Sequence, residues 1–356
     1  MPFNDTFLRA CRLQPTDYTP VWMMRQAGRY MSEYRAVREK HGFLEMCRTP
    51  ELAVEVTMQP VDLVGVDAAI LFSDILVVFD GMGLELEFAK GEGPVIHNPV
   101  RSVADVERLT VSDPIEHTGY VMDAIRILRR ELADKVPLIG FAGAPFTLAS
   151  YAIEGQGTRD YEKCKALMWS EPAAWDLLMN RFADTVIAYL CAQIDAGAQV
   201  VQMFDSWVGY VAPRDYERFV LPHSARVLAE VKAHGERAVD GGVPVIHFAN
   251  GATSMIELVQ KAGGDIVGVD WRLSMAEAVR RIDPRFGIQG NIDPVALFAP
   301  DDEIERQVVE ILEAVGTRPG HVFNLGHGIH KTSDPDKART LIRLVHEHSR
   351  RIRAGA

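Results

Sequence analysis

Short, nearly continuous apolar runs recur along the chain. Seven of them predict strands, at 67–74, 137–145, 199–207, 244–251, 265–272, 286–293 and 321–328. Runs of this length with little polar alternation are typical of parallel strands that are covered on both faces. Amphipathic segments of helical length separate most of the runs, and the clearest are 173–196 and 213–234. This alternation of strands and helices indicates a parallel α/β sheet.

The strand–helix rhythm continues through all 356 residues without a Ser- or Pro-rich linker. We therefore predict an α/β fold in one domain, 1–356, built as a single (β/α)8 (TIM) barrel. The pattern does not reveal the eighth strand. Residues 84–97 are predicted to form an inserted β-hairpin after the first strand, with strands at 84–88 and 94–97 and a turn at 91–93.

The predicted strands end in polar or conformationally special residues, which are Asp74, Pro145, Asp205, Ser206, Asn250, Asp270, Asn291 and His327. Barrel enzymes place their chemistry at the carboxyl ends of the strands. An open doubly wound sheet would show the same endings. The full-length rhythm and the lack of a GxGxxG motif after the first strand favour the barrel. Phosphate-loop and zinc-protease motifs are absent from the sequence as well.

Composition narrows the class of function. The formal net charge of −11 argues against a nucleic-acid surface, which is normally basic, although a pocket can carry the opposite sign. No apolar run approaches the roughly 18 residues of a membrane span, and the first residues lack a signal-peptide stretch. The cysteines Cys11, Cys47, Cys164 and Cys191 are scattered, as reduced thiols would be. We expect a cytoplasmic protein that binds neither membrane nor nucleic acid.

Two arginines stand close together near the start of the chain, in Arg25-Gln26-Ala27-Gly28-Arg29. Side chains four residues apart fall on one side of a helical turn. The planar guanidinium binds a carboxylate through two parallel hydrogen bonds, which lysine cannot do. The pair therefore indicates a carboxylate clamp. Two solvated helix arginines are the alternative, and the apolar flank 21–24 favours a partly buried setting instead.

Asp74 is a lone carboxylate within the apolar stretch 70–76. A buried charge is costly unless it is paired or hydrogen-bonded. The residue either caps a helix at the strand end or remains as an anion for a cationic or donor-rich ligand. The sequence leaves both interpretations open.

Three further candidates are weaker when each is taken alone. Tyr151 follows the small-residue run 141–150, which would let a partner approach the backbone, but a packed aromatic is the alternative. Ser206 has no GxSxG around it and is not predicted to be a nucleophile. His327 is flanked by glycines that leave room around it, unless it is a loop histidine bonded to backbone. His247, inside a predicted strand, is expected to be structural, and no cysteine–histidine spacing predicts a metal site.

The segments RQAGRY, FSDIL, FAGAPFTL with its following tyrosine, and NLGHG occur in this order at wide separations. Together they make the chain similar to the uroporphyrinogen decarboxylase family over about residues 4–350. The resemblance implies a single distorted (β/α)8 barrel and a homodimer without metal or organic cofactor. It implies conversion of uroporphyrinogen III to coproporphyrinogen III in heme and tetrapyrrole biosynthesis, in which four acetate side chains become methyls and four CO2 are released.

The resemblance also implies roles for the candidate residues. Substrate binding would involve Arg25, Gln26, Ala27, Gly28, Arg29, Asp74, Tyr151, Ser206 and His327. Catalysis would involve Asp74, Arg25, Arg29, Tyr151 and His327, with Asp74 accepting hydrogen bonds from the pyrrole N–H groups. An electron-rich pyrrole protonated on its ring is itself a cationic electron sink, which Asp74 would stabilise electrostatically. The proton donor stays open among Arg25, Arg29, Tyr151, His327 and water.

Two alternatives come from other classes of protein. The related zinc-dependent, cobalamin-linked methyltransferases have a His-x-Cys on a strand of this region, where this chain has His247-Phe248-Ala249. The alanine does not support a thiolate–zinc site. A non-catalytic tetrapyrrole-binding protein is the other alternative. Asp74 argues against it, because an anion in an apolar stretch is more than binding alone requires.

Overall fold

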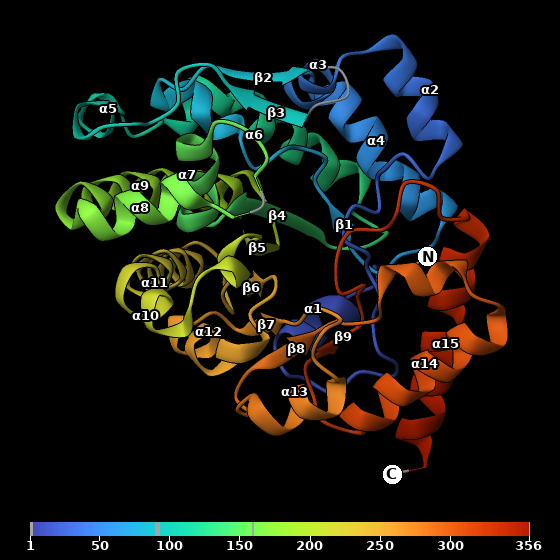
Figure 1. The fold of residues 1–356 in the computed structure, drawn as a ribbon. Helices are drawn as coiled ribbons and strands as arrows, with labels where there is room; N and C mark the ends of the chain where they lie inside the picture. The colour runs from blue at the N-terminus through green and yellow to red at the C-terminus, as the bar shows by residue number, and fades with distance from the viewer. Residues whose placement is uncertain (1–2, 90–92, 159, 356) are drawn as a thin grey trace.

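The computed structural model describes residues 3–89, 93–158 and 160–355. Its central feature is a curled parallel sheet with helices packed around it (Figure 1). Across the described part of the sheet the order is β1 (Ala69–Ile70), β4 (Leu138–Gly143), β5 (Val200–Asp205), β6 (Val245–Ala249), β7 (Ile266–Gly268), β8 (Gly287–Gln289) and β9 (His321–Val322). Each predicted run contains one of these strands, so the parallel α/β fold is confirmed.

The eighth position of the barrel is occupied by residues 20–22. Val21 forms a parallel bridge with Phe323, whose N–H donates to the carbonyl of Pro20 at 2.9 Å. On the other side, the N–H of Asp67 donates to the carbonyl of Val21 at 2.8 Å. This short segment therefore joins the β9 edge to the β1 edge. It was not predicted as a strand because it pairs over little more than one residue.

Helices cover the outside of the sheet and alternate with the strands along the chain (Figure 1). Their bounds are α1 (Thr6–Cys11), α2 (Ser32–Lys40), α3 (Phe43–Arg48), α4 (Pro50–Leu63), α5 (Val103–Arg108), α6 (Pro114–Glu131), α7 (Pro145–Glu154), α8 (Glu162–Ser170), α9 (Pro172–Ala196), α10 (Pro213–Phe219), α11 (Leu221–Ala238), α12 (Ile256–Ala262), α13 (Met275–Arg281), α14 (Asp301–Val315) and α15 (Pro335–Ala354). Short 3-10 helices are η1 (Val77–Met82), η2 (Val208–Tyr210), η3 (Thr253–Met255) and η4 (Pro294–Phe298). None of the described helices combines the length and apolar character that crossing a membrane requires.

The two helices that the sequence predicts most clearly differ in outcome. The prediction for 173–196 is confirmed by α9, which ends where Gly197 turns to a φ of 116°. The segment 213–234 is instead divided into α10 and α11 at Val220. Pro222 explains the break, because it has no N–H to donate to a carbonyl of the preceding turn and its ring crowds that turn.

The predicted hairpin is also present. Strands β2 (Leu86–Ala89) and β3 (Gly93–Ile96) pair antiparallel, with Leu86 opposite Ile96. The predicted turn residues 91 and 92 lie outside the described residues. The N–H of Ile96 donates to the carbonyl of Gly155 at 2.7 Å, which attaches the hairpin to the end of α7.

The interior of the barrel contains a buried polar chain. The indole N–H of Trp22 donates to Oε1 of Gln289 at 2.9 Å, and Nε2 of Gln289 donates to Oε1 of Gln202 at 3.1 Å. These residues come from the 20–22 segment, β8 and β5, which are not neighbours in the sheet. The contact therefore crosses the barrel interior, and it ties the closing segment to the opposite wall.

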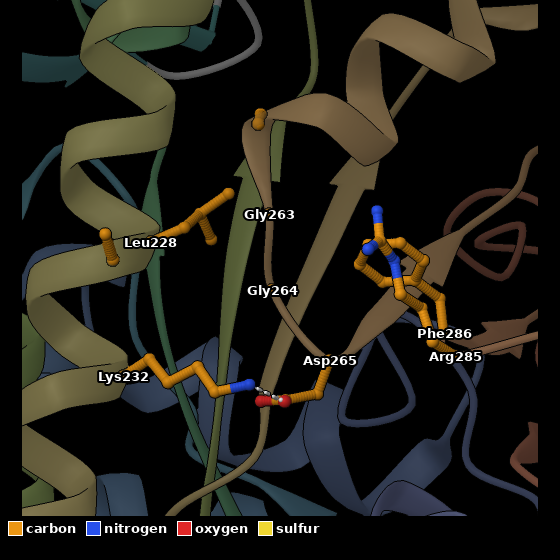
Figure 2. Close-up of a pocket in the computed structure, with 9 residues that line it drawn as sticks. Leu228, Lys232, Gly263, Gly264, Asp265, Arg285 and Phe286 are labelled. Carbon is orange, nitrogen blue, oxygen red and sulfur yellow. Dashed lines mark hydrogen bonds and ion pairs between the residues drawn. The ribbon is translucent and has the colours of Figure 1, made fainter. Parts of the chain in front are cut away.

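A cavity of about 330 Å³ lies at the amino end of the sheet (Figure 2). Asp265 and Phe286, which immediately precede β7 and β8, line it. Lys232 forms an ion pair with Asp265, whose other oxygen accepts the N–H of Val245 at 2.9 Å. Because the carboxyl ends of the strands are at the opposite end of the sheet, this cavity is separate from the predicted chemistry.

Candidate functional site

The segment with the two arginines is a loop, so the helical turn predicted from their four-residue spacing is wrong. Arg25 has a φ of 63°, in the left-handed region, and α2 begins only at Ser32. A Cβ on Gly28 would lie 2.8 Å from the carbonyl oxygen of Arg25, so this tight loop requires glycine there. Arg25 and Arg29 are both exposed, and their guanidiniums have no hydrogen-bond or ion-pair partner among the described residues.

Gln26 holds this loop against the barrel. Its side chain is fully buried, with Oε1 accepting the N–H of Met23 at 3.0 Å and Nε2 donating to the carbonyl of Ala68 at 3.0 Å. Both ends of the amide are therefore used by the protein backbone. Ala27 and Gly28 are half-buried beside it. Gln26 thus positions the arginines, and its side chain does not point into an open site.

The NLGHG segment binds the same loop from a position 300 residues further along the chain. Oδ1 of Asn324 accepts the N–H of Met24 at 3.0 Å, and the N–H of Ile329 donates to the carbonyl of Met24 at 2.9 Å. A Cβ on Gly328 would collide with the side chain of Arg25, which therefore lies directly against that glycine. The two motifs form one continuous structure.

His327 lies between Arg25 and Trp271. Its ring meets the Trp271 ring edge to face, with 6.0 Å between centroids. The flanking glycines are themselves closely packed, with Gly326 on the Trp271 backbone and Gly328 on Arg25, while His327 is half-buried. Burial lowers the pKa of His327 to about 4, and the positive charges of Arg25 and Arg272 act in the same direction. The imidazole is therefore neutral near pH 7.

Asp74 follows β1. The sequence left open whether it caps a turn or remains as an anion for a ligand, and the structure is consistent with both roles. Its Oδ1 accepts the N–H of Leu76 at 2.8 Å, just before η1, so the side chain does cap a turn. Among the described residues no other group donates to this carboxylate. Burial raises the pKa of Asp74 to about 6, while the Leu76 N–H and the charge of Arg25 oppose the rise. One carboxylate oxygen thus remains for a ligand.

Tyr151 belongs to α7 and lies near Asp74 and Arg25, whose charges both affect its pKa. Its ring contacts Trp207 edge to face at 5.7 Å. Burial raises its pKa to about 12, the negative charge of Asp74 adds to the rise, and the positive charge of Arg25 opposes it. The small-residue run that precedes Tyr151 has a packing role, since a Cβ on Gly143 would lie 3.1 Å from Cβ of Ile75. That space admits the FSDIL segment.

Ser206 lies half-buried at the carboxyl end of β5, and its carbonyl accepts from Nδ2 of Asn250 at 3.1 Å. Mutual electrostatic effects link Arg25 with Asp74, Tyr151 and His327, so the structure brings these four together. Arg29 is on the same loop, but the described side chain whose pKa its charge shifts is Tyr34.

Arg272 is a residue of this site that sequence reasoning missed. It follows β7, and its guanidinium carbon lies 3.9 Å from the ring centre of Trp271. Its charge contributes to the lowered pKa of His327. The only sequence signal was its position at the end of the predicted strand 265–272, where Asp270 was singled out instead.

His247 is fully buried in β6, and neither ring nitrogen has a hydrogen-bond partner in the described structure. Burial lowers its pKa to about 4. Ala249 follows two residues later on the same strand. In the described ranges, no three His, Cys, Asp or Glu side chains gather so that they could hold a metal ion.

Comparison with known proteins gives concordant results. The sequence matches the family described as uroporphyrinogen decarboxylase (URO-D) over residues 2–348. A uroporphyrinogen decarboxylase of Carboxydothermus hydrogenoformans is 59% identical over 97% of each chain. One from Geobacter metallireducens is 51% identical over 98% of this chain and 100% of its own. Among solved structures, a methyltransferase from Methanosarcina mazei superposes with a TM-score of 0.79 at 19% identity, covering 97% of this chain and 98% of that one, which shows the fold alone.

Proposed function

The chain belongs to the uroporphyrinogen decarboxylase family, and from that premise we propose how its residues divide the work of the reaction. It is a carboxy-lyase of heme biosynthesis, which converts the acetate side chains of uroporphyrinogen to methyl groups and releases CO2. The substrate carries eight carboxylates around a ring of four pyrroles. Its recognition therefore needs cationic groups for the periphery and a hydrogen-bond acceptor for the N–H groups.

The observation that carries the proposal is Asp74. Its carboxylate is desolvated enough to raise its pKa to about 6, it keeps one oxygen free of protein donors, and it lies within the electrostatic reach of Arg25. A free acceptor in a desolvated site suits the converging pyrrole N–H groups. Arg25 and Arg29, with unoccupied guanidiniums, suit the peripheral carboxylates.

The chemical step needs an electron sink, and the pyrrole supplies it. A proton adds to the ring carbon next to the one that bears the acetate, which leaves a cation shared between the ring carbons and nitrogen. The electron pair of the breaking C–CO2 bond then moves into this cation as CO2 departs. Protonation of the resulting exocyclic methylene and loss of the ring proton give the methyl group. Asp74 stabilises the cationic stage by electrostatics that are stronger there than in the ground state.

The site also restricts the source of the proton. His327, with a pKa near 4, does not carry an extra proton at neutral pH. Tyr151, with a pKa near 12, keeps its proton, so its hydroxyl is available to donate a hydrogen bond to the substrate. In this proposal Tyr151 and His327 orient the substrate. The proton then comes from Arg25, from Arg29 or from water.

The test is anaerobic incubation with chemically reduced uroporphyrinogen, followed by separation of the products by number of carboxylates. Stepwise appearance of hepta-, hexa-, penta- and tetracarboxylate species is expected. A parallel sample treated with chelator should behave in the same way, since the proposed roles need no metal. Tight binding without carboxylate loss would favour the tetrapyrrole carrier. Loss of turnover on chelation, with recovery on adding zinc, would favour metal-dependent chemistry.

Assembly and location are also part of the proposal. We propose that the chain works as one domain and as a homodimer in the cytoplasm. Support comes from exposed large apolar side chains such as Ile115, Trp169, Val295 and Phe298, and from the four cysteines, which are free thiols. Sedimentation at micromolar concentration should give about twice the 39.6 kDa chain mass. A monomer at every concentration would contradict the dimer.

A further inference from the structure

Arg272 is held in a fixed position at the carboxyl end of the barrel. Its guanidinium stacks on Trp271, and its Nη1 lies 3.3 Å from Oδ2 of Asp270 and 3.4 Å from Oδ1 of Asn250. The side chain is nevertheless 49% exposed. Stacking and pairing restrict its rotamers before any ligand arrives, so less conformational entropy is lost on binding.

Asp270 anchors this arrangement and does not neutralise the whole guanidinium. Its side chain is 2% exposed. Its Oδ1 accepts the N–H of Arg272 at 2.8 Å, and its Oδ2 also accepts the N–H of Gly251. Of the three guanidinium nitrogens of Arg272, only Nη1 has a partner among the described residues. The edge formed by Nε and Nη2 is free, and it has the spacing that binds one carboxylate through two parallel hydrogen bonds.

Arg272 neighbours the residues of the candidate site. Trp271, on which the guanidinium stacks, meets the ring of His327. Asn250, which contacts Nη1, donates to the carbonyl of Ser206 at the end of β5. Arg25 approaches His327 from the NLGHG side, through its contact with Gly328. Two guanidiniums, those of Arg25 and Arg272, therefore lie near enough to His327 to lower its pKa.

We propose that Arg272 is a substrate-binding residue that holds one of the propionate carboxylates of uroporphyrinogen. This inference rests on the proposed function and extends it. A guanidinium paired with a departing acetate would stabilise the carboxylate more than the neutral CO2 that it becomes, and would slow the reaction. A propionate keeps its charge through every round of decarboxylation. A fixed, half-exposed arginine at the rim therefore suits the carboxylate that stays.

Arg272→Gln tests this directly, because it removes the guanidinium and its two parallel hydrogen bonds but keeps a polar side chain. KM should rise about tenfold while kcat changes less than twofold, since a charged contact is lost in both ground and transition states. The rise should be equal for the eight-carboxylate substrate and for the five-carboxylate intermediate. Arg272→Lys, which can still pair with Asp270, should recover less than half of the affinity.

Arg285→Gln is the matched control. Arg285 stacks at 5.2 Å on Phe286 and lies 3.6 Å from Asp283, but it is at the amino end of the sheet (Figure 2). Its replacement should leave KM unchanged. Circular dichroism and melting temperature verify the fold of each variant, and Arg272→Lys serves as the readout if Arg272→Gln is unstable.

Three results would overturn the assignment. Unchanged KM in folded Arg272 variants would make it a surface residue, provided that the wild-type enzyme is active. A KM rise confined to the eight-carboxylate substrate would mean that it binds an acetate. A fall in kcat with unchanged KM would mean that Arg272 positions Trp271 and His327 and does not bind substrate. An inactive wild-type enzyme would instead contradict the proposed function itself.

Discussion

The two ends of the barrel use charge in opposite ways. At the amino end, Lys232 pairs with Asp265 (Figure 2), which also accepts a backbone N–H. Arg285 lies 3.6 Å from Asp283. At the carboxyl end, the guanidinium of Arg25 has no partner among the described residues. The amino end resembles an ordinary folded surface, where opposite charges meet.

This difference shows that charged groups without protein partners, and not the presence of a cavity, mark the functional end. The 330 Å³ cavity lies at the amino end, where Lys232 and Asp265 are already paired. The carboxyl end contains groups whose pKa values burial shifts towards the neutral form, namely Asp74 and His327. Desolvated groups without protein partners cost folding free energy, and enzymes retain them where a ligand completes the pairing.

The first way to test the comparison is to remove the carboxylate at each end. Asp74→Asn should lower kcat about a hundredfold or more, which corresponds to roughly 2.7 kcal/mol of transition-state stabilisation. Product affinity should change much less, because the lost interaction is strongest with the cationic ring. Steady-state kinetics and product titration measure the two effects.

Asp265→Asn is the control at the amino end. It should leave kcat intact and lower only the melting temperature, since a partly exposed ion pair contributes about 1 kcal/mol or less. If Asp74→Asn and Asp265→Asn lowered kcat equally, the effect of Asp74 would come from the stability of the fold and not from the reaction. Near-normal turnover in Asp74→Asn would reduce its role to capping the turn at Leu76.

The second test changes the shape of the cation but keeps its charge. Arg25→Lys should raise KM about ten- to a hundredfold, because lysine has no planar fork. Arg29→Lys should have a smaller effect, as its charge acts on Tyr34 and not on the Asp74 group. Arg285→Lys at the amino end should have none. Wild-type constants in both loop variants would contradict the clamp.

The third test uses pH. Burial raises the pKa of Asp74 to about 6, so the carboxylate gains a proton as the pH falls through 6. Because the anion is the active form in this proposal, kcat/KM should fall about tenfold per pH unit below 6. Above pH 7 this group should cause no further change. The residual activity of Asp74→Asn should not show this fall in kcat/KM below pH 6. If the fall persisted in the variant, it would come from another titrating group.

Local patterns predicted the sheet because each strand is a continuous apolar run. The closing segment escaped prediction since Val21 contributes a single bridge, and only Phe323 and Asp67, distant in sequence, complete it. The left-handed conformation of Arg25 has a similar origin. It is imposed by Asn324 and by the anchoring of Gln26 to Ala68. Spacing along the chain carries no information on such distant contacts.

The candidate site was predictable where family motifs contain its residues. Asp74, Arg25, Tyr151 and His327 lie in such motifs, and the structure brings them together. Arg272 lies in none of the motifs, and its place depends on Trp271 packing against Gly326. Its free edge is visible only when the partners of each nitrogen are known.

The last and smallest expected effect concerns Asp205, a buried carboxyl at the carboxyl end of β5 that is not assigned to the reaction. Its Oδ1 accepts from Oγ1 of Thr147 at 2.9 Å, while its Oδ2 has no partner in the described structure. Burial raises its pKa to about 7. Between about pH 4 and 7 the folded chain keeps this proton while the unfolded chain loses it, so stability falls as pH rises through that window.

Asp205→Asn keeps the hydrogen bond from Thr147 and cannot ionise. Relative to wild type, its melting temperature should therefore rise by about 2 °C or more at pH 8, where the wild type bears the full cost of the buried charge. At pH 5 the difference should shrink, because the wild-type carboxyl is then protonated in the folded state. Thermal scans of both proteins at the two pH values measure this. A pH-independent difference would show that Asp205 folds with its charge compensated, and Asp205 would then not count among the desolvated groups of the carboxyl end.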